Sequence, residues 1–78
     1  MSVRLDDVLL ALAECLGSGD EWTTAIDVGM TLGQSLPVTQ TELQLLEAEG
    51  YAEEDDAYVW TLTEMGFERV NDLKAAGR

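Results

Sequence analysis

The residue types that most often carry enzyme chemistry are scarce in this chain. It has no histidine and a single cysteine, Cys15, so a cysteine or serine nucleophile would lack its usual base. The segment Gly17-Ser18-Gly19 is the nearest approach to a phosphate-binding loop, but it follows a predicted helix instead of a strand and has no lysine beside it. We therefore expect no enzyme activity.

A run of four acidic residues, Glu53-Glu54-Asp55-Asp56, is the best candidate for a divalent metal site, because Ca²⁺ and Mg²⁺ take oxygen ligands. The run lacks the spaced ligands and the glycine of an EF-hand loop. A solvated acidic turn explains it better. We expect neither a metal nor a cofactor.

Charge is the most informative property of the sequence. Sixteen acidic residues oppose four basic ones, which gives a net charge of -12. The cations are Arg4, Arg69, Lys74 and Arg78, so none lies between residues 5 and 68. Such a surface should repel DNA at ordinary salt, because affinity for nucleic acid comes largely from Lys and Arg that neutralise phosphates.

Four interpretations of this charge remain open. The protein could work at very high salt, where the Debye length falls to about 3 Å. It could bind a partner protein with a basic surface, or it could imitate the charge of a nucleic acid. It could also be a soluble acidic domain and nothing more.

The cellular compartment is predicted from cysteine use and hydropathy. Cys15 cannot form an intramolecular disulfide, and its apolar neighbours predict a buried thiol, which fits a reducing cytoplasm. The sequence has no signal-peptide pattern and no apolar run approaching about 18 residues. We expect a cytoplasmic protein without a membrane segment.

Two helices are predicted in the first half of the chain. Leucine and valine residues recur at helical spacing over residues 4–16, where Asp6 and Asp7 lie in the first turn and favour the helix dipole. A second helix is expected over residues 23–32, with Thr24 and Asp27 as a capping box. Its inward residues should be Ile26 and Met30.

A third helix is expected over residues 37–49. Pro37 suits its first turn, and Thr39 with Glu42 has the spacing of a capping box, although the start could equally lie near Ser35. Gly50 is the natural residue for a left-handed helix end.

The remaining chain predicts a β-hairpin and a last helix. Residues 51–62 have the strand-forming composition of a hairpin, with Asp55-Asp56-Ala57 as its turn. Thr63 can cap a helix over residues 63–75. We expect Trp22 and Trp60 in the core, and the alternative is that one of them lies in an exposed patch that serves an interface.

The order of these elements predicts one α+β, mostly α domain over residues 1–78. Its architecture is a winged helix-turn-helix, in which a three-helix bundle is followed by a β-hairpin wing and a C-terminal helix.

Residues 43–70 resemble the core of winged-helix regulators of the MarR-like and PadR-like kind. The resemblance covers about a third of the chain closely, and its more specific part is a wing strand that runs into Leu-Thr-Glu-x-Gly. The matching residues are Leu43, Leu46, Glu47, Gly50 and Tyr51, followed by Trp60-Thr61-Leu62-Thr63-Glu64-Met65-Gly66. Gly66 inside a helix costs about 1 kcal/mol relative to alanine, so we expect close packing there.

The resemblance implies that the third helix enters the DNA major groove and that the wing reaches a phosphate or the minor groove. The exposed side of the third helix would then offer four uncharged polar residues: Thr39, Gln40, Thr41 and Gln44. Glutamine can pair with adenine through two hydrogen bonds. The wing would offer Glu53, Glu54, Asp55 and Asp56, where related proteins have Arg or Lys.

The last helix has an apolar stripe. In the resembling families a terminal helix commonly pairs two subunits, and a homodimer interface here would consist of Met65, Phe67, Val70 and Leu73. The alternative is that this stripe packs across the first helix of the same chain.

Two functions fit these observations. In the first, the protein is a small transcription-regulator-like winged helix that binds duplex DNA in a high-salt cytoplasm, such as that of a halophilic archaeon. In the second, it is an acidic interaction module or DNA mimic that binds a basic protein partner and no nucleic acid.

Overall fold

The structure is a computed structural model that describes residues 3–17, 19 and 21–77, with the side chains of residues 3 and 4 left aside. Ser18 and Arg78, which the sequence analysis named, lie outside the described residues. The elements are α1 (Val3–Leu16), β1 (Thr23–Thr24), α2 (Ala25–Leu32), α3 (Leu36–Ala48), β2 (Ala52–Glu54), β3 (Val59–Leu62) and α4 (Glu64–Ala75).

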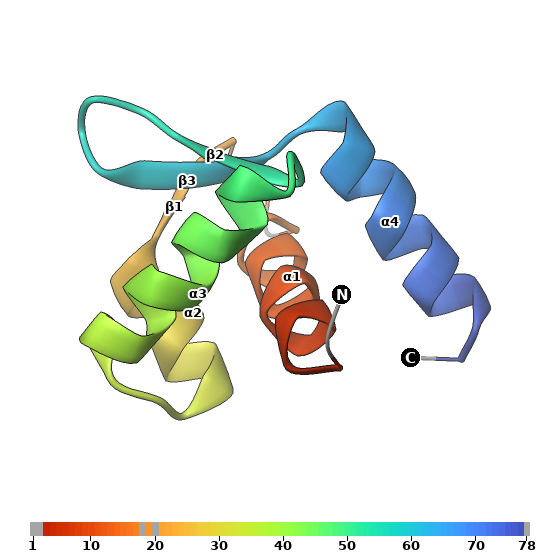
Figure 1. Ribbon diagram of the computed structural model, residues 1–78, viewed down its shortest axis with the longest axis horizontal. Coiled ribbons are helices and arrows are strands. Elements are labelled where there is room, and N and C mark those ends of the chain that lie inside the picture. Colours follow the sequence, from red (N-terminus) through yellow and green to blue (C-terminus); the bar gives the residue numbers. More distant parts are fainter. Residues whose placement is uncertain (1–2, 18, 20, 78) are drawn as a thin grey trace.

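Helix α1 lies at the centre of the molecule and contacts α2, α3 and α4 (Figure 1). Its apolar face supplies Val8, Leu9 and Leu12 to the core, where they meet residues from α3 and from the sheet. Trp60 of β3 is almost completely buried, as expected. Trp22 is 37% exposed, so its assignment to the core was wrong.

A short strand replaces the predicted start of the second helix. Thr23 pairs with Trp60 and Thr24 with Val59, both antiparallel, and the sheet order is β1-β3-β2. The expected cap is confirmed, since the backbone N–H of Asp27 donates to Thr24 Oγ1 over 3.1 Å. Thr24 has extended backbone angles as a cap residue should, and this leaves it free to pair with the edge of β3.

The inward face of α2 also differs from the prediction. Ala25, Val28 and Gly29 are buried, whereas Ile26 and Met30 are 56% and 76% exposed. The helix begins at Ala25, and a period of 3.6 residues from there turns positions 26 and 30 to the solvent.

Helix α3 begins earlier than its predicted capping box. Ser35 is the N-cap residue and Pro37 lies in the first turn, so the alternative start near Ser35 is the observed one. Gly50 follows the helix with a φ of 87°, a left-handed conformation that glycine adopts without steric cost.

The junction between α3, the wing and α4 is built around Thr63. Its hydroxyl donates to the carbonyl oxygen of Gly50 and accepts from the N–H of Gly66 over 3.1 Å, so Thr63 caps α4 as predicted. The predicted close packing at Gly66 is also present, because a Cβ there would overlap the carbonyl oxygen of Tyr51. The junction fixes where the wing leaves the helical bundle.

An ion pair joins the first and last helices. The guanidinium of Arg69 on α4 lies 3.3 Å from both carboxylate oxygens of Asp6 on α1. Asp6 is 5% exposed, so besides its place in the first turn of α1 it is a buried partner of Arg69, which the sequence did not predict.

Candidate nucleic-acid interface

The exposed side of α3 carries three of the four residues that were predicted to contact DNA. Gln40, Thr41 and Gln44 are exposed, whereas Thr39 is completely buried. The assignment of Thr39 to this surface was therefore wrong. Thr39 lies one helical turn before Leu43 and two turns before Leu46, so the 3.6-residue period could have placed it on the inward face.

Thr39 holds the helix-turn-helix together. Its hydroxyl oxygen Oγ1 donates to the carbonyl oxygen of Ser35 over 2.9 Å and accepts from Gln34 Nε2 over 3.1 Å. A Cβ added to Gly29 would lie 2.8 Å from Thr39 Oγ1, which is too close for an ordinary contact. Gly29 thus allows α2 and α3 to approach each other at this point.

Glu42 is the only acidic residue between positions 28 and 46, and it does not face the solvent. It is 8% exposed, and Gln34 Nε2 donates to its Oε1 over 2.6 Å. With the exception of Asp6, every other acidic residue that the structure describes is exposed. The helix-turn-helix surface from residue 28 to residue 46 is therefore uncharged in a strongly acidic molecule.

Sequence reasoning missed this uncharged surface. The gap between Asp27 and Glu42 is visible in the sequence, and the helical period places Glu42 one turn after Thr39, on the buried side of α3, where Gln34 hydrogen-bonds to it. The surface is also partly apolar, since Leu36, Val38 and Leu45 of α3 are all partly exposed.

The wing is as acidic in the structure as in the sequence. Glu53, Glu54, Asp55 and Asp56 are all exposed. Asp55 also builds the turn, because its Oδ1 accepts from the N–H groups of Ala57 and Val59 over 2.8 and 3.2 Å. Across residues 3–17, 19 and 21–77, no group of three acidic or cysteine side chains is placed to hold a metal ion.

Tyr58 is a wing residue that the sequence analysis did not single out. It is 78% exposed and has a φ of 61°, a left-handed conformation that is rare for a residue with a side chain. Its backbone N–H donates to the carbonyl oxygen of Asp55 over 3.2 Å, which holds the strained turn. The hairpin tip therefore presents an aromatic ring beside its carboxylates.

Neither cation whose side chain the structure describes lies near this surface. Arg69 is paired with Asp6 and Lys74 lies in the last turn of α4. The described parts of α2, α3 and the wing thus have no positive side chain with which to neutralise a phosphate.

The apolar stripe of α4 divides into two pairs. Met65 and Phe67 are each 53% exposed, whereas Val70 and Leu73 are buried in the core. Val70 and Leu73 are therefore unavailable for a dimer interface, and they pack within the chain, as the alternative predicted. The reason is that α4 packs against α1 and uses one side of its stripe there.

No family model and no curated protein matches the chain. Among solved structures it is similar to T. acidophilum IdeR, with a TM-score of 0.79 and 22% sequence identity. The chain has a winged-helix fold. The match covers 91% of this chain and 33% of the IdeR chain, so this winged helix spans about a third of the protein it resembles.

The predicted fold class is confirmed by this likeness and by the four helices and three-stranded antiparallel sheet that the described residues form. Among the described residues, no helix has both the length and the apolar character needed to cross a bilayer.

Proposed function

We propose that this winged helix binds duplex DNA at high salt and acts as a transcription regulator in the cytoplasm. Gln40, Thr41 and Gln44 of α3 contact base edges in the major groove. The observation that carries the proposal is the absence of exposed charge between residues 28 and 46. Exposed carboxylates occur on the other helices and on the wing. The exposed face of α3, which would enter the groove, has none up to Leu46.

Uncharged side chains suit this role. The amide of Gln40 or Gln44 can donate to and accept from adenine, and the exposed Val38 can contact a thymine methyl group. These contacts need no cation and do not depend on counterion release, so added salt does not weaken them. The winged-helix fold, which presents α3 next to the wing, supports the same assignment.

High salt is required because of the wing. Glu53, Glu54 and Asp56 would approach phosphates of the same sign, and like charges repel unless they are screened. In about 1 M salt the Debye length is about 3 Å, which removes most of this repulsion. Ordinary DNA-binding proteins lose affinity as salt rises, whereas this one should gain it.

The first experiment follows folding and DNA binding from about 0.1 M to about 3 M KCl, a range that takes screening from partial to nearly complete. A duplex is selected from a random pool at the upper end, and its affinity is then measured by fluorescence anisotropy. Circular dichroism identifies the salt range in which the chain is folded. Affinity that rises with salt within that range supports the proposal.

A double variant and a control variant test whether this binding uses the exposed face of α3. The double variant Gln40→Ala, Gln44→Ala should lose the selected duplex while keeping its fold. The matched control is Glu64→Gln at the start of α4, which should bind as the parent does. Equal affinity of the double variant and the control would overturn the assignment to α3.

A second function is favoured by the exposed apolar residues Leu36, Val38 and Leu45 on α3. With the acidic wing beside them, they would suit a partner protein that has an apolar patch with a basic rim. Salt separates the two functions, because pairing of opposite charges weakens as screening increases. Absence of duplex binding at every salt concentration, together with salt-sensitive binding of a basic protein, would favour the interaction module.

We also propose a homodimer, with a smaller interface than the sequence predicted. Only Met65 and Phe67 of the original stripe are exposed, so a dimer through α4 would be built on these two residues. Analytical ultracentrifugation of Met65→Ser and of the parent at high salt tests this.

A further inference from the structure

Helix α2 has an exposed apolar edge that the proposed DNA contacts do not use. Ile26 and Met30 are 56% and 76% exposed, although both are large apolar side chains. They are four residues apart, so they lie one above the other and form a short ridge along the helix, the α2 ridge. Apolar side chains that gather on a surface commonly mark an interaction site.

The α2 ridge borders helix α3. The closest approach of the two helices is at Gly29, where a Cβ would lie 2.8 Å from Thr39 Oγ1. On the other flank of α2, Thr31 Oγ1 lies 3.4 Å from Cys15 Sγ of α1. Successive residues of a helix are turned by about 100°, so the ridge comes next after Gly29 around α2, on the side away from Thr31. The ridge therefore lies towards α3 and away from α1.

Helix α3 continues this apolar surface with Val38 and Leu45, which are 45% and 49% exposed. Gln34, which follows α2, donates to Glu42 over 2.6 Å, so the Glu42 edge of α3 is the one next to α2. Val38 precedes Glu42 by four residues and Leu45 follows it by three, and a helix places such neighbours on one edge. These two residues and the α2 ridge form the α2–α3 strip.

The proposed DNA contacts lie on the opposite edge of α3. Helical spacing groups Gln40 and Gln44 with Glu47, whose Oε2 accepts from the N–H of Glu54 in the wing over 3.3 Å. The exposed side of α3 is therefore polar towards the wing and apolar towards α2. Val38 is the only residue of the strip to which the DNA proposal gives a contact.

The charges beside the strip are negative. Asp27 is three residues before Met30 on α2, Glu49 follows Leu45 by one turn, and both carboxylates are exposed. The sequence has no Lys or Arg between residues 5 and 68. A second copy of the chain would bring another net charge of -12, which would be repelled. A basic protein segment is the partner whose charge fits.

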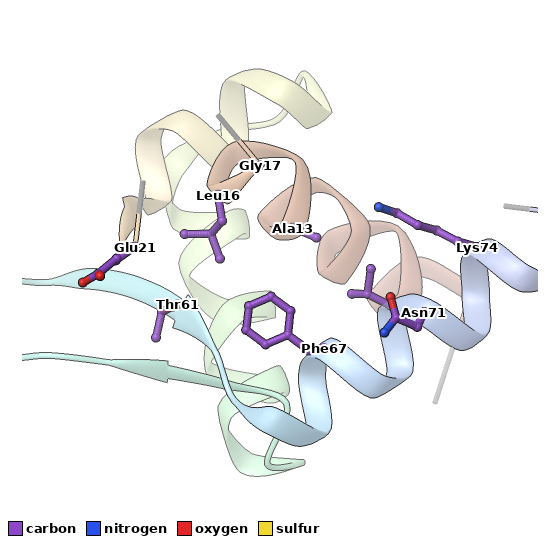
Figure 2. A pocket seen from close by; sticks show the side chains of 9 residues that line it. Ala13, Leu16, Gly17, Glu21, Thr61, Phe67, Asn71 and Lys74 are labelled. Atoms are coloured by element: carbon purple, nitrogen blue, oxygen red, sulfur yellow. The ribbon is translucent and has the colours of Figure 1, made fainter. Parts of the chain in front are cut away.

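Phe67 of α4 is also an exposed apolar side chain, but its surroundings differ. Figure 2 shows its ring in a hollow between α1, β3 and α4, and Lys74 lines the same hollow. The ammonium group of Lys74 would repel a basic partner. Phe67 is therefore a suitable control position for the strip.

We propose that the α2–α3 strip binds a basic amphipathic helix of a partner protein. The α2 ridge packs between the apolar side chains of that helix, and its Lys or Arg residues pair with Asp27 and Glu49. Met30 adapts its flexible side chain to the partner. This binding is a specific form of the second function proposed above, on which it rests, and it places the partner on α2.

The test uses a synthetic peptide of about 18 residues, long enough to form a helix, in which leucines at helical spacing form one stripe and lysines fill the other positions. One matched peptide has the same composition in shuffled order, without a stripe, and another has glutamate in place of lysine. Fluorescence anisotropy gives the affinities at the lowest salt concentration at which the chain is folded. We expect the striped lysine peptide to bind roughly tenfold more tightly than the shuffled one.

Three variants separate the apolar ridge from the charge. The double variant Ile26→Ser, Met30→Ser should bind the striped peptide only as tightly as the shuffled one. Phe67→Ser should bind as the parent does. Asp27→Asn, Glu49→Gln should weaken the lysine peptide and reduce the salt dependence of its binding. Circular dichroism checks that each variant is folded, and ¹H–¹⁵N amide shifts of the parent should centre on α2 and on Leu45.

Equal binding of the striped and shuffled peptides, or an unchanged affinity of the Ile26→Ser, Met30→Ser variant, would overturn the strip, because binding would then depend on net charge alone. Equal binding of the glutamate peptide would overturn the charge pairing. Amide shifts that grow with protein concentration without peptide would mean that a second copy covers the strip.

The same variants distinguish the strip from the functions proposed above. The double variant Gln40→Ala, Gln44→Ala should bind the striped peptide as the parent does, and Ile26→Ser, Met30→Ser should keep the selected duplex. A basic protein that binds the parent and the Ile26→Ser, Met30→Ser variant alike would leave the interaction module standing and remove this site from it.

Discussion

The carbonyl oxygen of Tyr51 lies directly against the backbone of Gly66, so that the chain leaving α3 and the first turn of α4 touch without a side chain between them. The same oxygen accepts a hydrogen bond from the N–H of Thr63 over 3.1 Å. This contact closes the base of the wing. It explains why a glycine occurs inside a helix, where it is otherwise unfavourable.

Gly66→Ala should destabilise the protein despite the better helix propensity of alanine. The new methyl group would overlap the Tyr51 carbonyl, and the resulting shift should cost about 1–3 kcal/mol of the free energy of unfolding. Urea denaturation at fixed salt measures it. The control is Gly17→Ala, whose Cβ would meet only ordinary contacts at 3.4 Å and should change stability little.

The ion pair between Asp6 and Arg69 should contribute to the attachment of α4 to α1. Removal of Arg69 in Arg69→Met leaves the buried carboxylate without this partner, and we expect a loss of about 1–3 kcal/mol, since the guanidinium is partly exposed. The double variant Asp6→Asn, Arg69→Met should recover part of this loss. Strictly additive single losses in a double-mutant cycle would show that the pair contributes nothing.

Substitutions at two positions of α3 should have different effects. A change at Thr39 should lower stability, and a change at Gln44 should lower the affinity for DNA. Thr39→Val removes the hydroxyl that contacts Ser35 and Gln34, so the free energy of unfolding should fall by about 1–2 kcal/mol. Gln44→Ala should leave stability unchanged and weaken the selected duplex by roughly tenfold, as loss of one base contact does. The reverse pattern would mean that α3 does not use its exposed face.

Neutralisation of the wing should lower the salt that DNA binding requires. The triple variant Glu53→Gln, Glu54→Gln, Asp56→Asn removes three exposed carboxylates, and at about 0.3 M salt, where screening is incomplete, its affinity should exceed that of the parent by roughly tenfold. Anisotropy with the selected duplex measures this. An unchanged salt profile would place the wing away from the phosphates.

Asp55 is left intact in that variant for a structural reason. Its Oδ1 accepts two backbone N–H groups, so Asp55→Ala should destabilise the turn by about 1 kcal/mol. Asp55→Asn removes the charge but keeps an acceptor oxygen. It should therefore stay close to the parent in thermal stability.

The amino-acid sequence by itself determined the features that depend on neighbouring residues. The two threonine caps, the left-handed Gly50 and the hairpin turn all follow from interactions over a few positions, and the predicted helix bounds lie within two residues of the observed ones. The close approach at Gly66 was predicted because a glycine within a helix needs a compensating contact.

Only the tertiary structure decided which polar and aromatic side chains are buried. Asp6 is buried because Arg69, from the far end of the chain, lies over it, and the buried carboxylate of Glu42 receives a hydrogen bond from Gln34 in the preceding turn. Thr23 and Thr24 form a strand because the distant β3 offers them an edge. Each of these features depends on residues that only folding brings together. The same holds for the uncharged surface of α3.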